Sequence, residues 1–241
     1  MLAHAVGSIL INGDFSPGLW SRVARPREGI ECALWRQTFA ADRWQVRYAQ
    51  AEGAPVRQAM SQDVSPHANA ACSLEIRGAD GVTQPVFVGQ RIEAAEAPRY
   101  RRNLVFSAWL GIEGSLAGTA EIELLCGTPR EPDVFGSGSS DDVKSELRET
   151  IHCPTGRWVH LEHPIDGRSF GSTGLSCELV LPAHLLARSA ACIRLANVRL
   201  DDLGAGMGGE RPAAVEAALA RRFFQRYDSS RINSLDRKSV V

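Results

Sequence analysis

The chain has almost no net charge, because its 27 Lys and Arg residues are balanced by 28 Asp and Glu residues. Without a basic excess, we expect no general attraction to nucleic acid or to an anionic membrane. Long apolar runs are also missing: the apolar stretch at residues 1–13 is too short to span a bilayer. No Lys or Arg precedes that stretch, so it does not resemble a signal peptide. We therefore expect no nucleic-acid partner and no membrane insertion.

Paired cysteine spacing is missing as well. The six cysteines are at positions 32, 72, 126, 153, 177 and 192, and none forms a C-x-x-C or zinc-type pattern. Most lie in apolar, strand-like runs, where a free thiol behaves as a small hydrophobic side chain. The pattern favours free buried thiols over a disulfide framework, and hence assembly in a reducing cytoplasm.

Catalytic motifs are scarce. No Ser-His-Asp order lies in a recognisable nucleophile elbow, and the Gly-rich stretches carry no Walker lysine. His160 and His163 have a spacing that suggests a metal site, but residues three apart on a strand point to opposite faces. The acidic doublet Asp141-Asp142 fits a solvated loop. These absences argue against an enzyme.

Short strand patterns fill most of the chain. Residues 9–11 form a short apolar strand that ends at Asn12-Gly13, where the chain can turn, and Phe15 follows as an apolar anchor. Residues 44–48 alternate between large apolar and polar side chains. Comparable runs occur at 32–39, 72–77, 86–92, 103–110, 119–125, 143–153, 157–161, 175–181 and 192–200. A run at 56–64 alternates poorly and is expected to form an edge strand. The regular spacing of these runs predicts a β-sandwich rather than βαβ units. Because Trp44, Trp109 and Trp158 lie inside such patterns, we assign all three to the core.

The chain changes character after Asp201-Asp202. The sandwich is expected over residues 1–202, and four glycines make residues 203–209 a linker. Residues 210–228 are predicted to form an amphipathic helix, followed by a tail at 229–241. Apolar residues recur every four positions along this helix and form one stripe, which consists of Val215, Leu219, Phe223 and Tyr227. This stripe either packs on its own sandwich or forms an interface between subunits.

Several motifs together resemble the jelly-roll module of phage and prophage tail-fibre proteins, a relative of β-sandwich carbohydrate-binding modules. The opening "NGDF…W…ADRW" is one, and others are "GQRIE" at 89–93, the strand at 104–110, "GRW" at 156–158 and "RRFFQRY" at 221–227. The resemblance covers about residues 8–228. It implies an all-β fold: a jelly-roll β-sandwich with a C-terminal α-helix.

The resemblance also implies a receptor-binding protein that holds a cell-surface polysaccharide without catalysis. Such binding needs exposed aromatic side chains that stack on sugar faces, with polar groups nearby. Trp20 and Trp35 flank an arginine-rich loop, and Tyr100 lies within a second one. The candidate glycan-binding residues are therefore Trp20, Trp35, Arg99, Tyr100, Arg101 and Arg102. The arginines would suit an acidic polysaccharide; the alternative is that they are simply solvated.

No cofactor is required, but a structural calcium ion fits the resemblance. Sandwich modules of this kind often hold calcium where the first turn meets the last strand. Calcium takes several oxygen ligands, which Asn12, Asp14, Asp201 and Asp202 could supply. The alternative is that these side chains cap turns.

The implied setting is a virion or phage-like particle assembled in the bacterial cytoplasm. Partners would then be other particle proteins and further copies of the chain, with a trimer favoured for the homo-oligomer. The alternative function is purely structural: a subunit of a tail, head or gene-transfer particle that joins a spike or fibre to the particle and binds no glycan.

Overall fold

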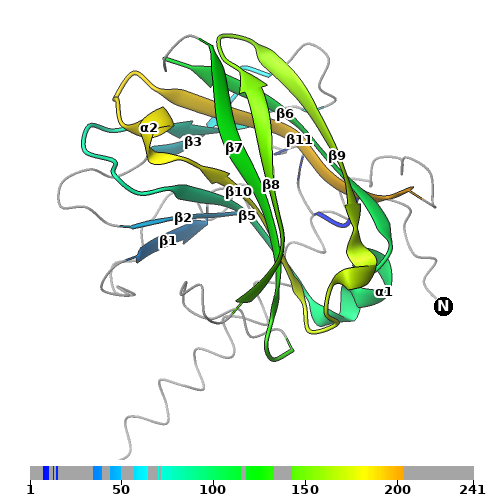
Figure 1. Cartoon of the computed structure of the whole chain (residues 1–241). Coiled ribbons are helices and arrows are strands. Elements are labelled where there is room, and N and C mark those ends of the chain that lie inside the picture. The colour runs from blue at the N-terminus through cyan, green and yellow to red at the C-terminus, as the bar shows by residue number, and fades with distance from the viewer. Residues whose placement is uncertain are drawn as a thin grey trace, which may run out of the picture.

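The computed structural model describes residues 8–10, 13, 15, 35–39, 44–49, 57–64, 70, 72–114, 118–132 and 143–203. In this part of the chain, eleven strands form two antiparallel sheets that face one another (Figure 1). All eleven strand patterns predicted beyond residue 30 correspond to strands of the structure. The alternation of side chains gives each sheet one apolar face, and the two apolar faces pack together.

The first sheet, sheet A, has six strands. In spatial order they are β1 (Trp35–Phe39), β2 (Gln45–Ala49), β5 (Val86–Ile92), β10 (Leu175–Leu181), β7 (Thr119–Pro129) and β8 (Val143–Pro154). Sheet B has five strands: β3 (Arg57–Ser61), β4 (Ser73–Arg77), β11 (Cys192–Asp202), β6 (Asn103–Glu113) and β9 (Trp158–Asp166). The chain crosses repeatedly from one sheet to the other, and this strand order confirms the predicted jelly-roll β-sandwich.

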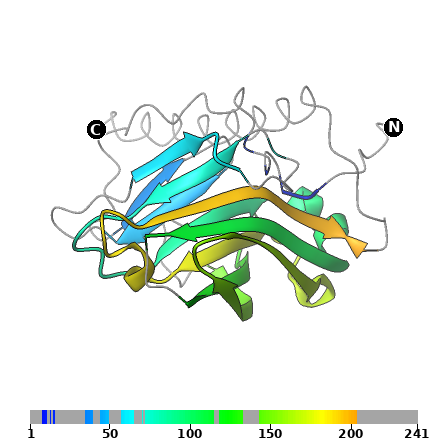
Figure 2. The ribbon, with the colours of Figure 1, turned by 90° about the horizontal axis from the view of Figure 1, so that it is seen from above.

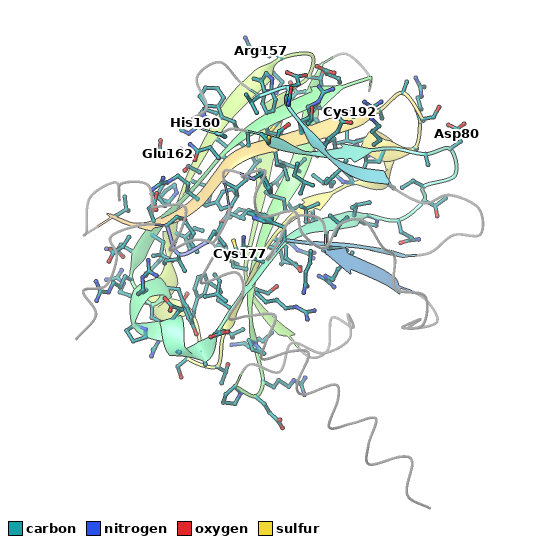
Figure 3. The ribbon with its side chains drawn as sticks, turned by 180° about the vertical axis from the view of Figure 1, so that it is seen from behind. Asp80, Arg157, His160, Glu162, Cys177 and Cys192 are labelled. Carbon is teal, nitrogen blue, oxygen red and sulfur yellow. The ribbon has the colours of Figure 1, made fainter. Side chains whose placement is uncertain are left out.

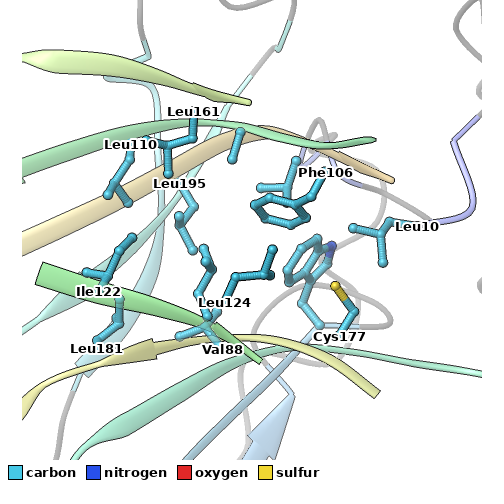
Figure 4. Close-up of a cluster of buried hydrophobic side chains, with 14 of the residues drawn as sticks. Leu10, Val88, Phe106, Leu110, Ile122, Leu124, Leu161, Cys177, Leu181 and Leu195 are labelled. Atoms are coloured by element: carbon cyan, nitrogen blue, oxygen red, sulfur yellow. The ribbon is translucent and has the colours of Figure 1, made fainter. Parts of the chain in front are cut away.

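The core lies between the sheets and is almost purely aliphatic and aromatic. Figure 4 shows side chains of both sheets meeting there, among them Leu124 and Val88 from sheet A and Phe106 and Leu195 from sheet B. All four are at most 2% exposed. Burial of each such side chain contributes about 1.5–3 kcal/mol, so this layer supplies most of the stability.

The N-terminal segment closes one side of the sandwich against β11. Ile9 and Leu10 are buried as predicted, but residues 8–10 are irregular rather than a strand. The Ile9 amide donates to the Leu200 carbonyl at 2.7 Å. Gly13 lies so close to the carbonyl of Val198 that a side chain would not fit there. Phe15 is fully buried against Trp44, with ring centroids 5.1 Å apart, which confirms both as core residues.

The five described cysteines are free and buried, as predicted, while Cys32 lies outside the described residues. Cys126 on β7 and Cys177 on β10 are direct cross-strand neighbours, and their Sγ atoms are 3.8 Å apart. The hydrogen bond to Cys177, together with burial, raises the pKa of the Cys126 thiol well above its ordinary value. Burial raises the pKa of Cys153 to about 11. The thiols of Cys126 and Cys153 therefore stay protonated at neutral pH.

Short helical turns connect the strands. They are η2 (Ala94–Glu96), α1 (Ala97–Tyr100), η3 (Gly167–Ser169) and α2 (Ala183–Leu186). Strand β11 runs the length of its layer beside β6 (Figure 2). The register of this pair shifts between Ala196 and Arg199, and Asn197 there has a positive φ of 46°.

Leu203 is the last described residue. The rest of the predicted linker, the helix at 210–228 and the tail at 229–241 lie outside the described residues, so they stay predictions. Among the helices that the structure describes, none has the length and apolarity that a membrane span requires.

Candidate functional site

The arginine-rich segment between β5 and β6 is a helical turn rather than an open loop. Tyr100 ends α1, and its ring is fully buried. Its hydroxyl accepts a hydrogen bond from the Gly174 amide at 3.1 Å. The prediction that Tyr100 stacks on a sugar is therefore wrong, because its ring has no solvent-facing surface.

Two of the three arginines of this turn have carboxylate partners. Arg99 donates to Glu96 at 2.9 Å, and Arg102 donates to Asp202 at 2.8 Å. Arg101 is exposed. The charge that suggested an acidic ligand is thus largely neutralised, by Glu96 beside the turn and by Asp202 at the end of β11.

Neither of the two tryptophans that flank the first arginine-rich loop has a described side chain. Trp35 begins β1, where its backbone pairs with Ala49, and its side chain lies outside the described part. Trp20 lies outside the described residues altogether. Both remain predictions.

Both described aspartates of the predicted calcium site are bonded to arginine. The two carboxylate oxygens of Asp201 accept from Arg199 at 2.8 and 3.2 Å, and Asp202 accepts from Arg102. Asn12 and Asp14 lie outside the described residues. In the described part of the chain, no three His, Cys, Asp or Glu side chains are grouped as a metal would need. Calcium binding therefore remains a prediction, and any ion would compete with two guanidinium groups.

The outer face of sheet B carries aromatic side chains that we had assigned to the core. In β6 the even-numbered residues from Leu104 to Ile112 point inward and are buried, so Trp109 lies on the opposite, outer side of the sheet. In β9, Leu161 and Ile165 point inward, which puts Trp158 on the outer side. Trp109 and Trp158 are half-buried rather than buried, and their assignment to the core is wrong.

Trp109, Trp158 and His160 form what we call the aromatic strip. Trp109 and His160 are direct cross-strand partners, with ring centroids 5.0 Å apart and planes tilted by 40°. Trp158 is paired with Gly111 in the neighbouring row. Atoms of its indole lie 3.2–3.4 Å from where a Cβ of Gly111 would be, so glycine lets the ring lie flat on β6. The strip therefore spans two strands, with Trp109 on β6 and both Trp158 and His160 on β9.

Polar groups border the strip along β9. Figure 3 shows Arg157, His160 and Glu162 following one another along the same side of the molecule. All three are exposed. Glu162 is paired with Ser107 of β6, in the row next to Trp109. The strip therefore has hydrogen-bonding groups at both ends.

An ion-pair cluster holds the adjoining part of sheet B in place. Arg194, in register with Gly111, donates to Glu75 and Asp63 at 2.9 Å and to Glu113 at 2.8 Å. Burial alone would raise the pKa of the Glu75 carboxyl, but hydrogen bonds from Arg77 and Arg194 outweigh it and lower that pKa. Burial would likewise lower the pKa of Arg194, yet Glu113 and Glu75 raise it. Glu75 and Arg194 therefore stay ionised at neutral pH. The cluster lies beside the strip, because Arg194 and Trp158 both pair with Gly111.

His160 and His163 lie on opposite sides of β9, as the strand geometry predicted. His160 is exposed in the aromatic strip, whereas His163 is half-buried between the inward-pointing Leu161 and Ile165. The pair does not converge on a common point. The proposed interface residues Val215, Leu219, Phe223 and Tyr227 lie outside the described residues.

Comparison with family models finds no match for the chain, and comparison with curated proteins finds none either. Solved structures do show similar arrangements of strands. One is the family 11 carbohydrate-binding module of the cellulosomal cellulase Lic26A-Cel5E of Clostridium thermocellum, at 14% identity and a TM-score of 0.39, covering 87% of this chain and 99% of that one.

Two further structures show a comparable degree of likeness. The CBM22-2 xylan-binding domain of Paenibacillus barcinonensis Xyn10C has 13% identity and a TM-score of 0.41, covering 71% of this chain and 93% of that one. An arabinose-bound GH51 α-L-arabinofuranosidase has 12% identity and a TM-score of 0.41, covering 82% of this chain. The match spans only 30% of that enzyme. At these identities the likeness concerns the fold alone and assigns neither ligand nor activity.

Proposed function

We propose that the protein binds a glycan, without catalysis, on the aromatic strip of sheet B. The observation that carries this proposal is the Trp109–His160 pair, with 5.0 Å between ring centroids, on the outer face of sheet B. Trp158 extends the same apolar surface over Gly111. A ligand that packs on large aromatic side chains gains stability by burying them, so an outer face with three such side chains offers area for this contact.

The chemistry of the strip matches that of a sugar. A sugar ring presents C–H groups on its faces, which pack on aromatic rings, and hydroxyl groups at its rim. Trp indoles supply large, rigid contact area, and the Trp N–H group can donate a hydrogen bond. Ser107 and Glu162 in the neighbouring row can accept or donate hydrogen bonds to hydroxyls. Binding sites of small polar ligands commonly combine such apolar surface with a few polar groups.

A glycan array with the purified protein, followed by titration calorimetry on the polysaccharides it binds, tests this function. We expect Trp109→Ala and Trp158→Ala each to weaken binding by about tenfold, since stacked aromatic contacts contribute about 0.5–1.5 kcal/mol beyond buried area. His160→Ala should weaken it less. Circular dichroism would show that each variant remains folded.

His152→Ala is the matched control, because His152 is a 64% exposed imidazole on β8 of the other sheet. Its glycan binding should equal that of the wild type. Arg101→Ala measures the contribution of the arginine-rich turn in the same assay. If the wild type binds no glycan, or both tryptophan variants bind as the wild type does, the strip is not a glycan site.

We infer further that this binding serves host attachment by a phage-like particle, with the chain as a fibre or spike subunit. The support is the sequence resemblance over about residues 8–228 and the free thiols, which suit assembly in a bacterial cytoplasm. Added in excess, the wild-type protein should block adsorption of particles to cells, and Trp109→Ala should not. A chain present in particles that neither competes nor binds glycan would be the structural subunit of the alternative hypothesis.

A further inference from the structure

We infer that the ligand of the aromatic strip is a neutral polysaccharide and that Glu162 sets this preference; the inference rests on the proposed function. Glu162 is exposed on β9, two residues beyond His160 and therefore on the same face. Across the sheet it is paired with Ser107, in the row adjoining Trp109 and His160. A sugar stacked on Trp109 would therefore meet this carboxylate at its rim.

Among the described residues, Glu162 differs from the other carboxylates around it in having no cationic partner. Arginine binds each of the following described carboxylates of sheet B and its loops: Asp63, Glu75, Glu113, Asp166 and Asp201. Within the described ranges, no Lys, Arg or His side chain forms an ion pair with Glu162. Arg199, in the same row, is held by Asp201. The charge of Glu162 is thus available to a ligand.

An ionised carboxylate can only accept hydrogen bonds. The hydroxyl groups of a neutral sugar can donate to it, and such charge-assisted bonds are stronger than neutral ones. A carboxylate on an acidic sugar would instead be repelled: at about 4 Å, two like charges cost about fivefold in affinity even in bulk water. Glu162 therefore favours neutral sugars at the position of Trp109 and disfavours acidic ones.

Arg157 does not reverse this preference. It is exposed, but it precedes Trp158 and so lies at the far end of the strip from Glu162. An acidic polysaccharide carries charge on many of its units, so contact with Arg157 does not keep other units away from Glu162. The arginines of the helical turn, which had suggested an acidic ligand, are largely neutralised by Glu96 and Asp202.

The test uses an array of neutral glucans and mannans, each beside its carboxymethylated form, at low salt. The wild type should bind the neutral form at least about fivefold more tightly. Glu162→Gln should weaken binding of the neutral form and remove most of the preference. Glu121→Gln is the matched control, since Glu121 is a 68% exposed carboxylate on β7 of the other sheet. Arg157→Gln should leave the preference in place.

The outcomes separate the two claims. Tighter binding of carboxymethylated glycans by the wild type, or an unchanged preference in Glu162→Gln, would overturn the role of Glu162 even if Trp109→Ala abolishes binding. The proposed function itself fails if no glycan is bound or if Trp109→Ala has no effect. Added salt should narrow the wild-type preference, because exposed charges are screened, and a salt-independent preference would also count against Glu162.

Discussion

Tyr100 belongs to the core although three arginines surround it in the sequence. It ends a single helical turn, which directs its ring inward while Arg101 and Arg102 remain exposed. The Gly174 amide, itself buried, donates to the Tyr100 hydroxyl. The side chain therefore fixes the β5–β6 connection against the loop that precedes β10, and its role is structural.

Replacing Tyr100 by Phe should destabilise the fold without changing glycan binding. The variant keeps the ring but leaves the buried Gly174 N–H without this acceptor, which costs about 1–3 kcal/mol. Urea unfolding followed by tryptophan fluorescence measures the loss. Arg101→Ala, on the exposed neighbour, should stay within about 0.5 kcal/mol of the wild type. Loss of glycan binding by Tyr100→Phe at unchanged stability would contradict this assignment.

The aromatic strip shows what the sequence can and cannot reveal about single residues. An apolar strand pattern identified β6 and β9 correctly, but membership of a strand does not say which face a residue occupies. For Trp109 the sequence did contain the information. Leu104, Phe106 and Leu110 are separated by even numbers of residues and so share one face of the strand, whereas Trp109 falls on the opposite face. The contact of Trp158 with Gly111 depends on the pairing of two strands about 47 residues apart, which no local pattern encodes.

At the scale of an element, Arg194 ties β11 to its neighbours. Its side chain is only 11% exposed and reaches carboxylates before β4, on β4 and at the end of β6. Glu75 is 7% exposed and shared with Arg77. The two arginines thus bind the same carboxylate, one from a buried position and one from an exposed position.

Arg194→Gln should cost far more stability than Arg77→Gln. Removing the buried cation leaves Glu75 poorly compensated, a loss of about 3–5 kcal/mol for a buried pair. Arg77 is 56% exposed, and exposed pairs contribute about 0–1 kcal/mol. Urea unfolding at neutral pH measures the stability loss of each variant. Equal losses would show that the burial of the arginine does not determine how much its ion pair contributes.

The same cluster makes the free energy of unfolding depend on pH in the acidic range. Folding lowers the pKa of the Glu75 carboxyl from 4.5. The ionised carboxylate therefore contributes to the free energy of unfolding when the pH is above the pKa of the unfolded state. That contribution is lost as pH falls through the lowered, folded pKa. Glu75→Gln should accordingly flatten the acid side of the stability curve, and an unchanged acid side would show that other carboxylates dominate.

The strand patterns predicted the elements well because alternation is local, whereas sheet order depends on distant partners. The edge position of residues 56–64 was expected from their poor alternation, and β3 does lie at the edge of sheet B. The bonds that join Ser8 to Leu200 link residues 192 positions apart. Such contacts follow from the closing of the whole sandwich, which is why the irregular path of residues 8–10 was not predicted.

For the whole molecule, the predicted helix at 210–228 remains the basis for expecting an oligomer. Its stripe of Val215, Leu219, Phe223 and Tyr227 needs burial, and weak glycan sites gain affinity when several copies bind together. We expect the wild type to sediment as a trimer and Leu219→Asp with Phe223→Asp to give a folded monomer. Ala217→Asp with Arg221→Asp, on the opposite side of the predicted helix, is the control. A monomeric wild type, or unfolding of the double variant, would mean that the stripe packs within one chain.

The register shift in β11 means that Asn197 is one extra residue relative to the partner strand β6. The strand accommodates it locally, as a bulge. Before it, Ile193 and Leu195 face the core, and after it Val198 and Leu200 do, so the inward set passes from odd to even positions. The positive φ of Asn197 accommodates the extra residue. Deleting Asn197 would restore strict alternation. All remaining side chains of β11 would keep their present faces. Deleting Arg194 instead would put the neighbouring stretch out of phase, turning core residues toward solvent.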